Sequence, residues 1–123
     1  MNLGSFSVSL AVKDISKSLA FYQVLGFEIA GGDQDQNWLI LRNQNHTIGL
    51  FQGMFEDNLM TFNPGWDDFA NPVAEFSDIR EIQSHLKSSG VEMLSEADED
   101  SAGPASAMLT DPDGNIILLD QHV

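Results

Sequence analysis

The 123-residue chain contains no cysteine, and it has only 5 lysine and arginine residues against 19 aspartates and glutamates. The missing cysteines exclude disulfides, thiolate nucleophiles and thiolate metal sites. The formal charge of −14 repels phosphate backbones and anionic membranes, so we expect neither nucleic acid nor membrane as a partner. No apolar run approaches the roughly 20 residues of a membrane span, and no signal peptide is visible. We therefore predict a cytoplasmic protein.

The sequence contains an internal repeat. Hydrophobic residues make up 42% of the chain, which is enough for a packed interior, and the length predicts a single domain over residues 1–123. Positions 64 apart carry the same residue four times, in the pairs Asp14 and Asp78, Ile15 and Ile79, Gly26 and Gly90, and Glu28 and Glu92. We therefore predict two equivalent modules, 4–52 and 70–123, joined by a linker over 53–69.

Each module is predicted as a strand, a helix and three strands. Apolar and small residues alternate over 6–12, which is the period of a half-buried strand. Asp14 can cap the following helix, and Gly26 suits its C-terminal end. The remaining strands of the first module are predicted at 27–29, 38–41 and 47–51. The second module is predicted with a strand at 73–76, a helix at 78–89 and strands at 91–94, 107–110 and 115–120.

The later strands of the modules match at a larger offset of 69, which pairs Leu50 with Leu119 and Gln52 with Gln121. The five extra residues lie in the acidic stretch 95–105, which we predict as an exposed loop. The linker 53–69 is unusually rich in bulky apolar residues, whereas a flexible linker is polar and rich in glycine. Two interpretations stay open for it: the linker closes the core, or it forms the wall of a ligand cleft.

Several short motifs resemble one known family. They are Val12-Lys13-Asp14, Ser18-Leu19-Ala20-Phe21-Tyr22, Leu25-Gly26-Phe27, and Asp111-Pro112-Asp113-Gly114-Asn115 before an apolar strand. In this order the chain resembles the vicinal oxygen chelate superfamily, which includes glyoxalase I, bleomycin-resistance proteins and extradiol dioxygenases. The resemblance implies an α+β fold of two tandem modules, whose mixed and antiparallel sheet forms a cup with the helices outside. One fold of this kind supports several chemistries, so the resemblance does not select an activity.

The resemblance also implies where a metal would be bound. Metal-dependent members carry four ligands, usually His and Glu, on the first and last strands of each module. These positions fall on Ser7, Gly49, Asn71 and Leu118, and the repeat relates 7 to 71 and 49 to 118. None of the four is an ordinary metal ligand. We therefore predict no metal and no other cofactor, and we expect the three histidines, His46, His85 and His122, at the surface.

The cup could still bind a small molecule. Strand alternation places hydroxyl, amide, carboxylate and apolar side chains inside it, which is the usual lining of a ligand site. The predicted ligand-binding residues are Ser7, Ser9, Thr47, Phe51, Trp66, Asn71 and Leu118. Two carboxylates, Glu75 and Asp120, are candidate general bases if they are buried beside an open cavity.

Three functions fit the sequence. The first is binding of a small, partly apolar molecule without a metal. The second is a lyase or isomerase type of enzyme that uses Glu75 or Asp120 as a base, and the third is a non-catalytic interaction module with a filled cup. The family resemblance also implies a homodimer.

Overall fold

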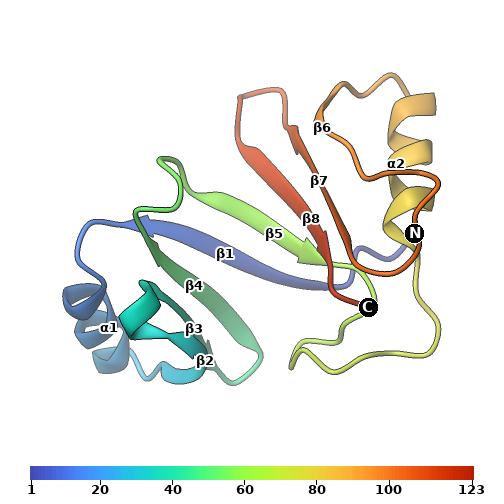
Figure 1. Cartoon of the computed structure of the whole chain (residues 1–123). Coiled ribbons are helices and arrows are strands. Elements are labelled where there is room, and N and C mark those ends of the chain that lie inside the picture. Colours follow the sequence, from blue (N-terminus) through green and yellow to red (C-terminus); the bar gives the residue numbers. More distant parts are fainter. The chain divides into compact units, whose positions relative to one another are not determined.

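The computed structural model describes residues 1–123, which form two compact units (Figure 1). The N-terminal unit contains residues 7–59, and the C-terminal unit contains residues 1–6 together with 60–123. The first residues are held in the C-terminal unit by specific contacts. The backbone N–H of Asn2 donates to Oγ of Ser77 at 3.2 Å, and the ring centroids of Phe6 and Phe62 lie 5.0 Å apart.

The N-terminal unit confirms the predicted order of strand, helix and three strands. Its strands follow one another in the sheet as β2-β3-β4-β1, with β1 parallel to β4 and the other pairs antiparallel. A short 3₁₀ helix, η1, precedes β3. The elements are β1 (Ser5–Val12), α1 (Ile15–Val24), β2 (Glu28–Asp33), η1 (Gln34–Gln36), β3 (Trp38–Asn43) and β4 (His46–Gln52).

The C-terminal unit repeats this arrangement. Its strands follow in the order β5-β8-β7-β6, so the first strand of the module again lies beside the last. The elements are β5 (Leu59–Asn63), α2 (Ile79–Ser88), β6 (Met93–Ser95), β7 (Ala105–Thr110) and β8 (Ile116–Gln121). The duplicated α+β architecture is therefore confirmed. Neither helix is long and apolar enough to cross a membrane.

The first strand of the second module does not lie where the sequence predicted it. Residues 73–76 form no strand, and β5 takes this role from within the segment predicted as a linker. In β5 the side chains of Leu59, Thr61 and Asn63 are buried, whereas the two between them are half-buried. The sequence did not reveal this alternation, because two of the buried residues, Thr61 and Asn63, are polar, whereas the half-buried Met60 and Phe62 are apolar. Fifteen residues, 64–78, then connect β5 to α2, where only two connect β1 to α1. The single domain over 1–123 stays a prediction.

Each unit has its own hydrophobic core between its helix and one face of its strands. The fully or nearly fully buried residues of the N-terminal core are Ile15, Leu39, Leu41 and Leu50. Those of the C-terminal core are Ile79, Ile82, Ala97, Ala107, Leu109 and Leu119. Leu10, Val12 and Ile48 pack against the N-terminal core, as predicted for the helix-facing side of β1 and β4. Neighbouring residues of a strand point to opposite faces of the sheet. The residues between these core residues therefore lie on the sheet face away from the helix.

The repeated Asp and Gly residues have the same role in both modules. Asp14 and Asp78 are the N-caps of α1 and α2, and their carboxylates accept backbone N–H groups of the first helical turn. Gly26 and Gly90 follow the helix ends with φ of 95° and 87°. This left-handed conformation is one that glycine adopts without a steric penalty. Of the four identical pairs in the repeat, one therefore caps the start of each helix and another follows its end.

The repeated glutamines join each helix to its sheet. In the N-terminal unit, Oε1 of Gln52 accepts the backbone N–H of Ile15 at 2.9 Å. In the C-terminal unit, Oε1 of Gln121 accepts the backbone N–H of Ile79 at 2.7 Å. Both N–H groups belong to the first turn of a helix and lack a partner within it. The last strand of each module thus completes the cap of the module's helix.

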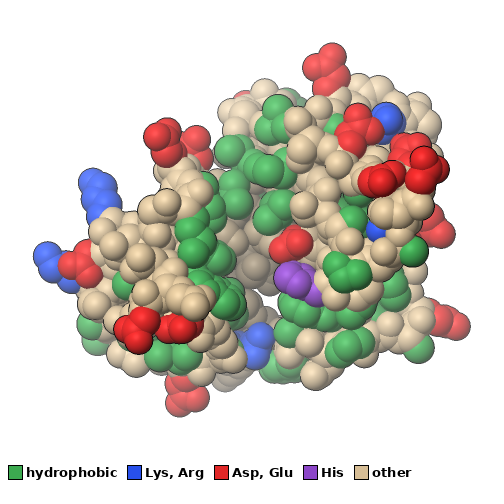
Figure 2. Space-filling model, viewed as in Figure 1, with side chains coloured by type: hydrophobic (Ala, Val, Ile, Leu, Met, Phe, Trp, Pro, Cys, Tyr) green, Lys and Arg blue, Asp and Glu red, His purple; other side chains and the backbone are tan.

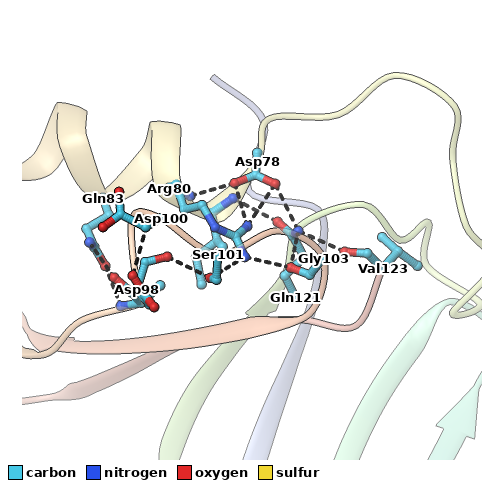
Figure 3. A network of polar contacts seen from close by, with 11 residues as sticks. Asp78, Arg80, Gln83, Asp98, Asp100, Ser101, Gly103, Gln121 and Val123 are labelled. Carbon is cyan, nitrogen blue, oxygen red and sulfur yellow. Dashed lines mark hydrogen bonds and ion pairs between the residues drawn. The ribbon is translucent and has the colours of Figure 1, made fainter.

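Gln121 is the centre of a larger polar network (Figure 3). Its Nε2 group lies 3.0 Å from Oδ2 of Asp78, 3.1 Å from the Gly103 carbonyl and 2.8 Å from the Val123 carbonyl. Arg80 donates through Nη1 to both carboxylate oxygens of Asp78. Burial alone would raise the pKa of Asp78, but the hydrogen bonds from the Arg80 N–H, Gln121 and the Arg80 guanidinium outweigh it, so this pKa lies below its usual value.

We expect Gln121→Leu to destabilise the protein more than Gln52→Leu. Gln121 is 2% exposed and makes four hydrogen bonds, so its loss leaves buried polar groups without partners. The expected losses in the free energy of unfolding are about 3 kcal/mol for Gln121→Leu and about 1 kcal/mol for Gln52→Leu. Urea unfolding followed by circular dichroism measures both. Equal losses would contradict the central role of Gln121.

Candidate functional site

In the N-terminal unit, the sheet face opposite α1 carries the candidate ligand site. Leu39 and Leu50 point toward α1, so their strand neighbours point to the other face. The strand register there pairs Ser9 with Gly49 and Trp38 with Phe51. This surface, which we call the N-terminal face, includes four residues predicted from the sequence: Ser7, Ser9, Thr47 and Phe51.

Aromatic rings cover one end of the N-terminal face. The rings of Trp38 and Phe51 are nearly parallel, with centroids 6.4 Å apart and an interplanar angle of 9°, and Phe55 lies 5.3 Å from Phe51. A Cβ atom added at Gly49 would lie 2.5 Å from Cε2 of Phe51. The Phe51 ring therefore occupies the space that any side chain at position 49 would need.

Polar groups lie at other points of the N-terminal face. The Ser9 side chain belongs to a buried residue in the middle of the face. Further along, Oγ1 of Thr47 accepts from Nε of Arg42 at 3.3 Å. An apolar aromatic end with a few fixed polar groups is the chemistry of a site for a small, partly apolar molecule.

In the C-terminal unit, the structure brings two of the predicted residues, Trp66 and Asp120, together with His122. Leu119 and Gln121 face α2, so Leu118 and Asp120 lie on the opposite face of β8. Oδ2 of Asp120 is 3.0 Å from Nε2 of His122. The imidazole of His122 stacks on the indole of Trp66, with centroids 4.3 Å apart and an interplanar angle of 6°.

Two predicted site residues lie elsewhere. Asn71 and Glu75 are exposed and belong to the connection 64–78 rather than to a strand. The backbone N–H and carbonyl of Asn71 bond to Asp67, which closes a local turn. The prediction that both residues lie on a strand is wrong, because the long connection separates β5 from α2. Glu75 consequently lacks the burial that its role as a base requires.

Sequence reasoning missed the contacts of His122 with Asp120 and Trp66. Asp120 and His122 are two positions apart at the end of an extended strand, so their side chains leave the chain on the same side. That spacing was a visible signal of an Asp–His pair. The stacked indole was not predictable, because it comes from a turn 56 positions earlier in the chain (122−66).

One cavity of about 430 Å³ lies in the N-terminal unit, at the start of α1. None of the predicted site residues lines it. Its walls include both signs of charge, and the carboxylate of Asp14 is already used as the helix cap. We assign no ligand to it. The lining residues are Lys13, Asp14, Ile15, Ser16, Gln34, Asp35, Asn37 and Gln52.

The residues at the family's metal positions do not fit a metal ion. Gly49 and Leu118 offer no donor atom, and the Phe51 ring fills the space beside Gly49. Ser7 has only a neutral hydroxyl, Asn71 lies outside the strands, and β5, which is the actual first strand of the second module, contains no imidazole or carboxylate. A divalent cation that acts as a Lewis acid needs several imidazole or carboxylate ligands. The structure contains no group of three or more His, Asp or Glu side chains that could hold one.

Comparison with known proteins identifies the family. Residues 4–119 match the model of the Glyoxalase/Bleomycin resistance protein/Dioxygenase superfamily. The chain belongs to this superfamily. The family resemblance seen in the sequence is thereby confirmed over almost the whole chain.

Three relatives illustrate this superfamily membership. Virulence protein STM3117 of Salmonella typhimurium is 28% identical over 118 residues, which are 93% of this chain and 81% of that protein. A superfamily member from Vibrio splendidus has a TM-score of 0.66 at 19% identity, covering 94% of this chain and 97% of the other. An extradiol ring-cleaving dioxygenase from B. fuscum has a TM-score of 0.59 at 18% identity, covering 98% of this chain but 32% of its own. The two structures show the shared fold alone.

We expect the purified protein to bind zinc and nickel only substoichiometrically. The reason is the donor set at the family positions, which lacks imidazole and carboxylate groups. Incubation with each metal, gel filtration and elemental mass spectrometry measure the bound amount. One firmly held equivalent per chain would contradict this expectation.

Proposed function

We propose that this superfamily member binds a small, partly apolar molecule on the N-terminal face without a metal. The observation that carries the proposal is the Phe51 ring, which covers Gly49 and stacks with Trp38. At the position where metal-dependent members have a ligand, this chain presents an aromatic surface. Flat aromatic surfaces favour planar or alicyclic ligands through offset stacking and apolar burial.

The polar groups of the N-terminal face would orient such a ligand. Thr47 carries a half-buried hydroxyl group on the same face as Phe51, and the strand register fixes its place there, whereas Ser9 on that face is buried, at 6% exposure. Hydroxyl groups can donate to or accept from a ligand. Burial of the apolar part would supply most of the affinity, and the hydroxyls would supply selectivity.

We expect 2-naphthol or 2-naphthoic acid to raise the melting temperature, because a ligand that binds only the folded state stabilises it. The chain has one tryptophan in each unit, so single-tryptophan variants locate the binding. Ligand-dependent quenching should persist in Trp66→Phe and disappear in Trp38→Phe. Thermal-shift and fluorescence titrations measure these effects.

Phe51→Ala should weaken the binding about tenfold or more, since it removes one of the stacked rings. The control is Phe21→Ala, which removes an exposed ring of α1 in the same unit. Binding that is unchanged in Phe51→Ala, or no stabilisation by either naphthalene compound, would contradict the proposal.

A second proposal concerns self-association. Exposed apolar side chains gather at the C-terminal end of α1 and on β2, namely Phe21, Val24, Leu25 and Ile29. Strand β2 ends the strand order, so its outer edge has no partner in the chain. The α1 sequence contains no Asp or Glu, whereas β2 has the exposed Glu28 and Asp33 at its two ends. Acidic side chains are spread over the face drawn in Figure 2. Two copies of charge −14 repel least where acidic side chains are absent, as on α1, so we propose a homodimer through α1 and the edge strand β2.

We expect Val24→Glu to convert the dimer into a monomer, because Val24 is 87% exposed and lies within this apolar surface. The control is Ser84→Glu, which adds the same charge to an exposed position of α2. Sedimentation equilibrium measures the mass of each variant. A monomeric wild-type protein, or a dimer that survives Val24→Glu, would overturn this proposal.

A further inference from the structure

The C-terminal unit contains a histidine in a chemically distinctive setting. His122 pairs through Nε2 with Asp120 and stacks on Trp66, as described above. The side chains of His122 and Asp120 are 46% and 35% exposed, so the pair is open to small molecules. No hydrogen bond occupies Nδ1 of His122, which is the nitrogen that remains for a reactant.

Both partners of this pair are held in place by other bonds. Nδ2 of Asn63 donates to the Asp120 carbonyl at 2.8 Å, which ties β8 to the end of β5. On the other side of His122, the Val123 carbonyl accepts from Gln121. The backbone on both sides of the imidazole is therefore fixed within the C-terminal unit.

The indole is fixed by its own turn. The backbone N–H of Trp66 donates to the Asn63 carbonyl at 3.2 Å, and an isolated bridge pairs Trp66 with Pro72. Gly65 allows this approach: a Cβ there would lie 2.3 Å from Cγ2 of Val123 and 3.4 Å from the Phe76 ring. Apolar side chains thus surround the turn that presents Trp66.

We propose that His122 is a metal-independent acyl-accepting residue for small aromatic esters, with Asp120 as its positioning residue. The Asp120 carboxylate accepts the Nε2 proton, which leaves the Nδ1 lone pair as the nucleophile. The aromatic leaving group packs against the apolar surroundings of Trp66 and Phe76. This site lies entirely in the C-terminal unit and is independent of the ligand proposed for the N-terminal face.

Water is the only co-reactant that the reaction needs besides the ester. Nδ1 attacks the ester carbonyl carbon, and the bond to the phenolic oxygen breaks, so the phenolate leaves with the electron pair. The acyl-imidazolium that forms keeps its Nε2 proton, which stays hydrogen-bonded to the Asp120 carboxylate. Water then cleaves the acyl–nitrogen bond, which releases the carboxylic acid and one proton to the solvent and restores the imidazole with its Nε2 proton.

The test uses 4-nitrophenyl acetate and the absorbance of released 4-nitrophenolate. We expect the protein to react faster than the same concentration of free imidazole, and His122→Gln to lower its rate constant about tenfold or more. His46→Gln and His85→Gln are matched controls, since both histidines lie outside this site, and their rates should be unchanged. No excess over free imidazole, an unchanged rate in His122→Gln, or an equal fall in all three variants would overturn the proposal.

The positioning role of Asp120 is tested by a separate measurement. Nitrogen-15 NMR of the imidazole should show the neutral His122 protonated at Nε2 in the wild type and a mixture of tautomers in Asp120→Asn. The ester rate should fall in Asp120→Asn without a change in the unfolding curve, and Asp120→Glu should restore part of it. A wild-type rate and tautomer in Asp120→Asn would exclude a positioning role.

Discussion

The bond between a helix N-terminus and a glutamine at the end of the module's last strand is the contact on which both units depend. Gln52 and Gln121 each accept the first free N–H of their helix, next to an aspartate cap. This bond fixes where the helix starts on the sheet, and the apolar side of the strands then packs against that helix. The residues on the opposite face, including every candidate functional group on β4 and β8, are placed as a consequence.

The two modules share this contact but differ in the chain that leads to it. Two residues connect β1 to α1, whereas fifteen connect β5 to α2. The longer connection gives the C-terminal unit a turn that the N-terminal unit lacks, and this turn places Trp66 against His122. An insertion before a fixed helix start therefore adds a side chain to the site without disturbing the core.

The two units carry different functional side chains. The N-terminal face presents stacked aromatic rings over Gly49, and the C-terminal unit presents an Asp–His pair beside an indole. Neither arrangement provides the set of imidazole and carboxylate ligands that a Lewis-acid metal needs. The duplicated fold thus carries stacked aromatic rings in one half and an Asp–His pair in the other.

The sequence by itself determined the duplication, both helices with their caps and C-terminal glycines, and the lack of a donor side chain at Gly49 and Leu118. These features depend on local spacing and residue chemistry, which a single chain displays directly. It also placed Ser9, Thr47 and Phe51 on one face through strand alternation. Only the tertiary structure decided that β5 rather than 73–76 is the first strand of the second module, because two apolar segments competed for one position beside β8. Only the tertiary structure brought Trp66 to His122, since a stacking contact between distant turns leaves no periodic signal in the sequence.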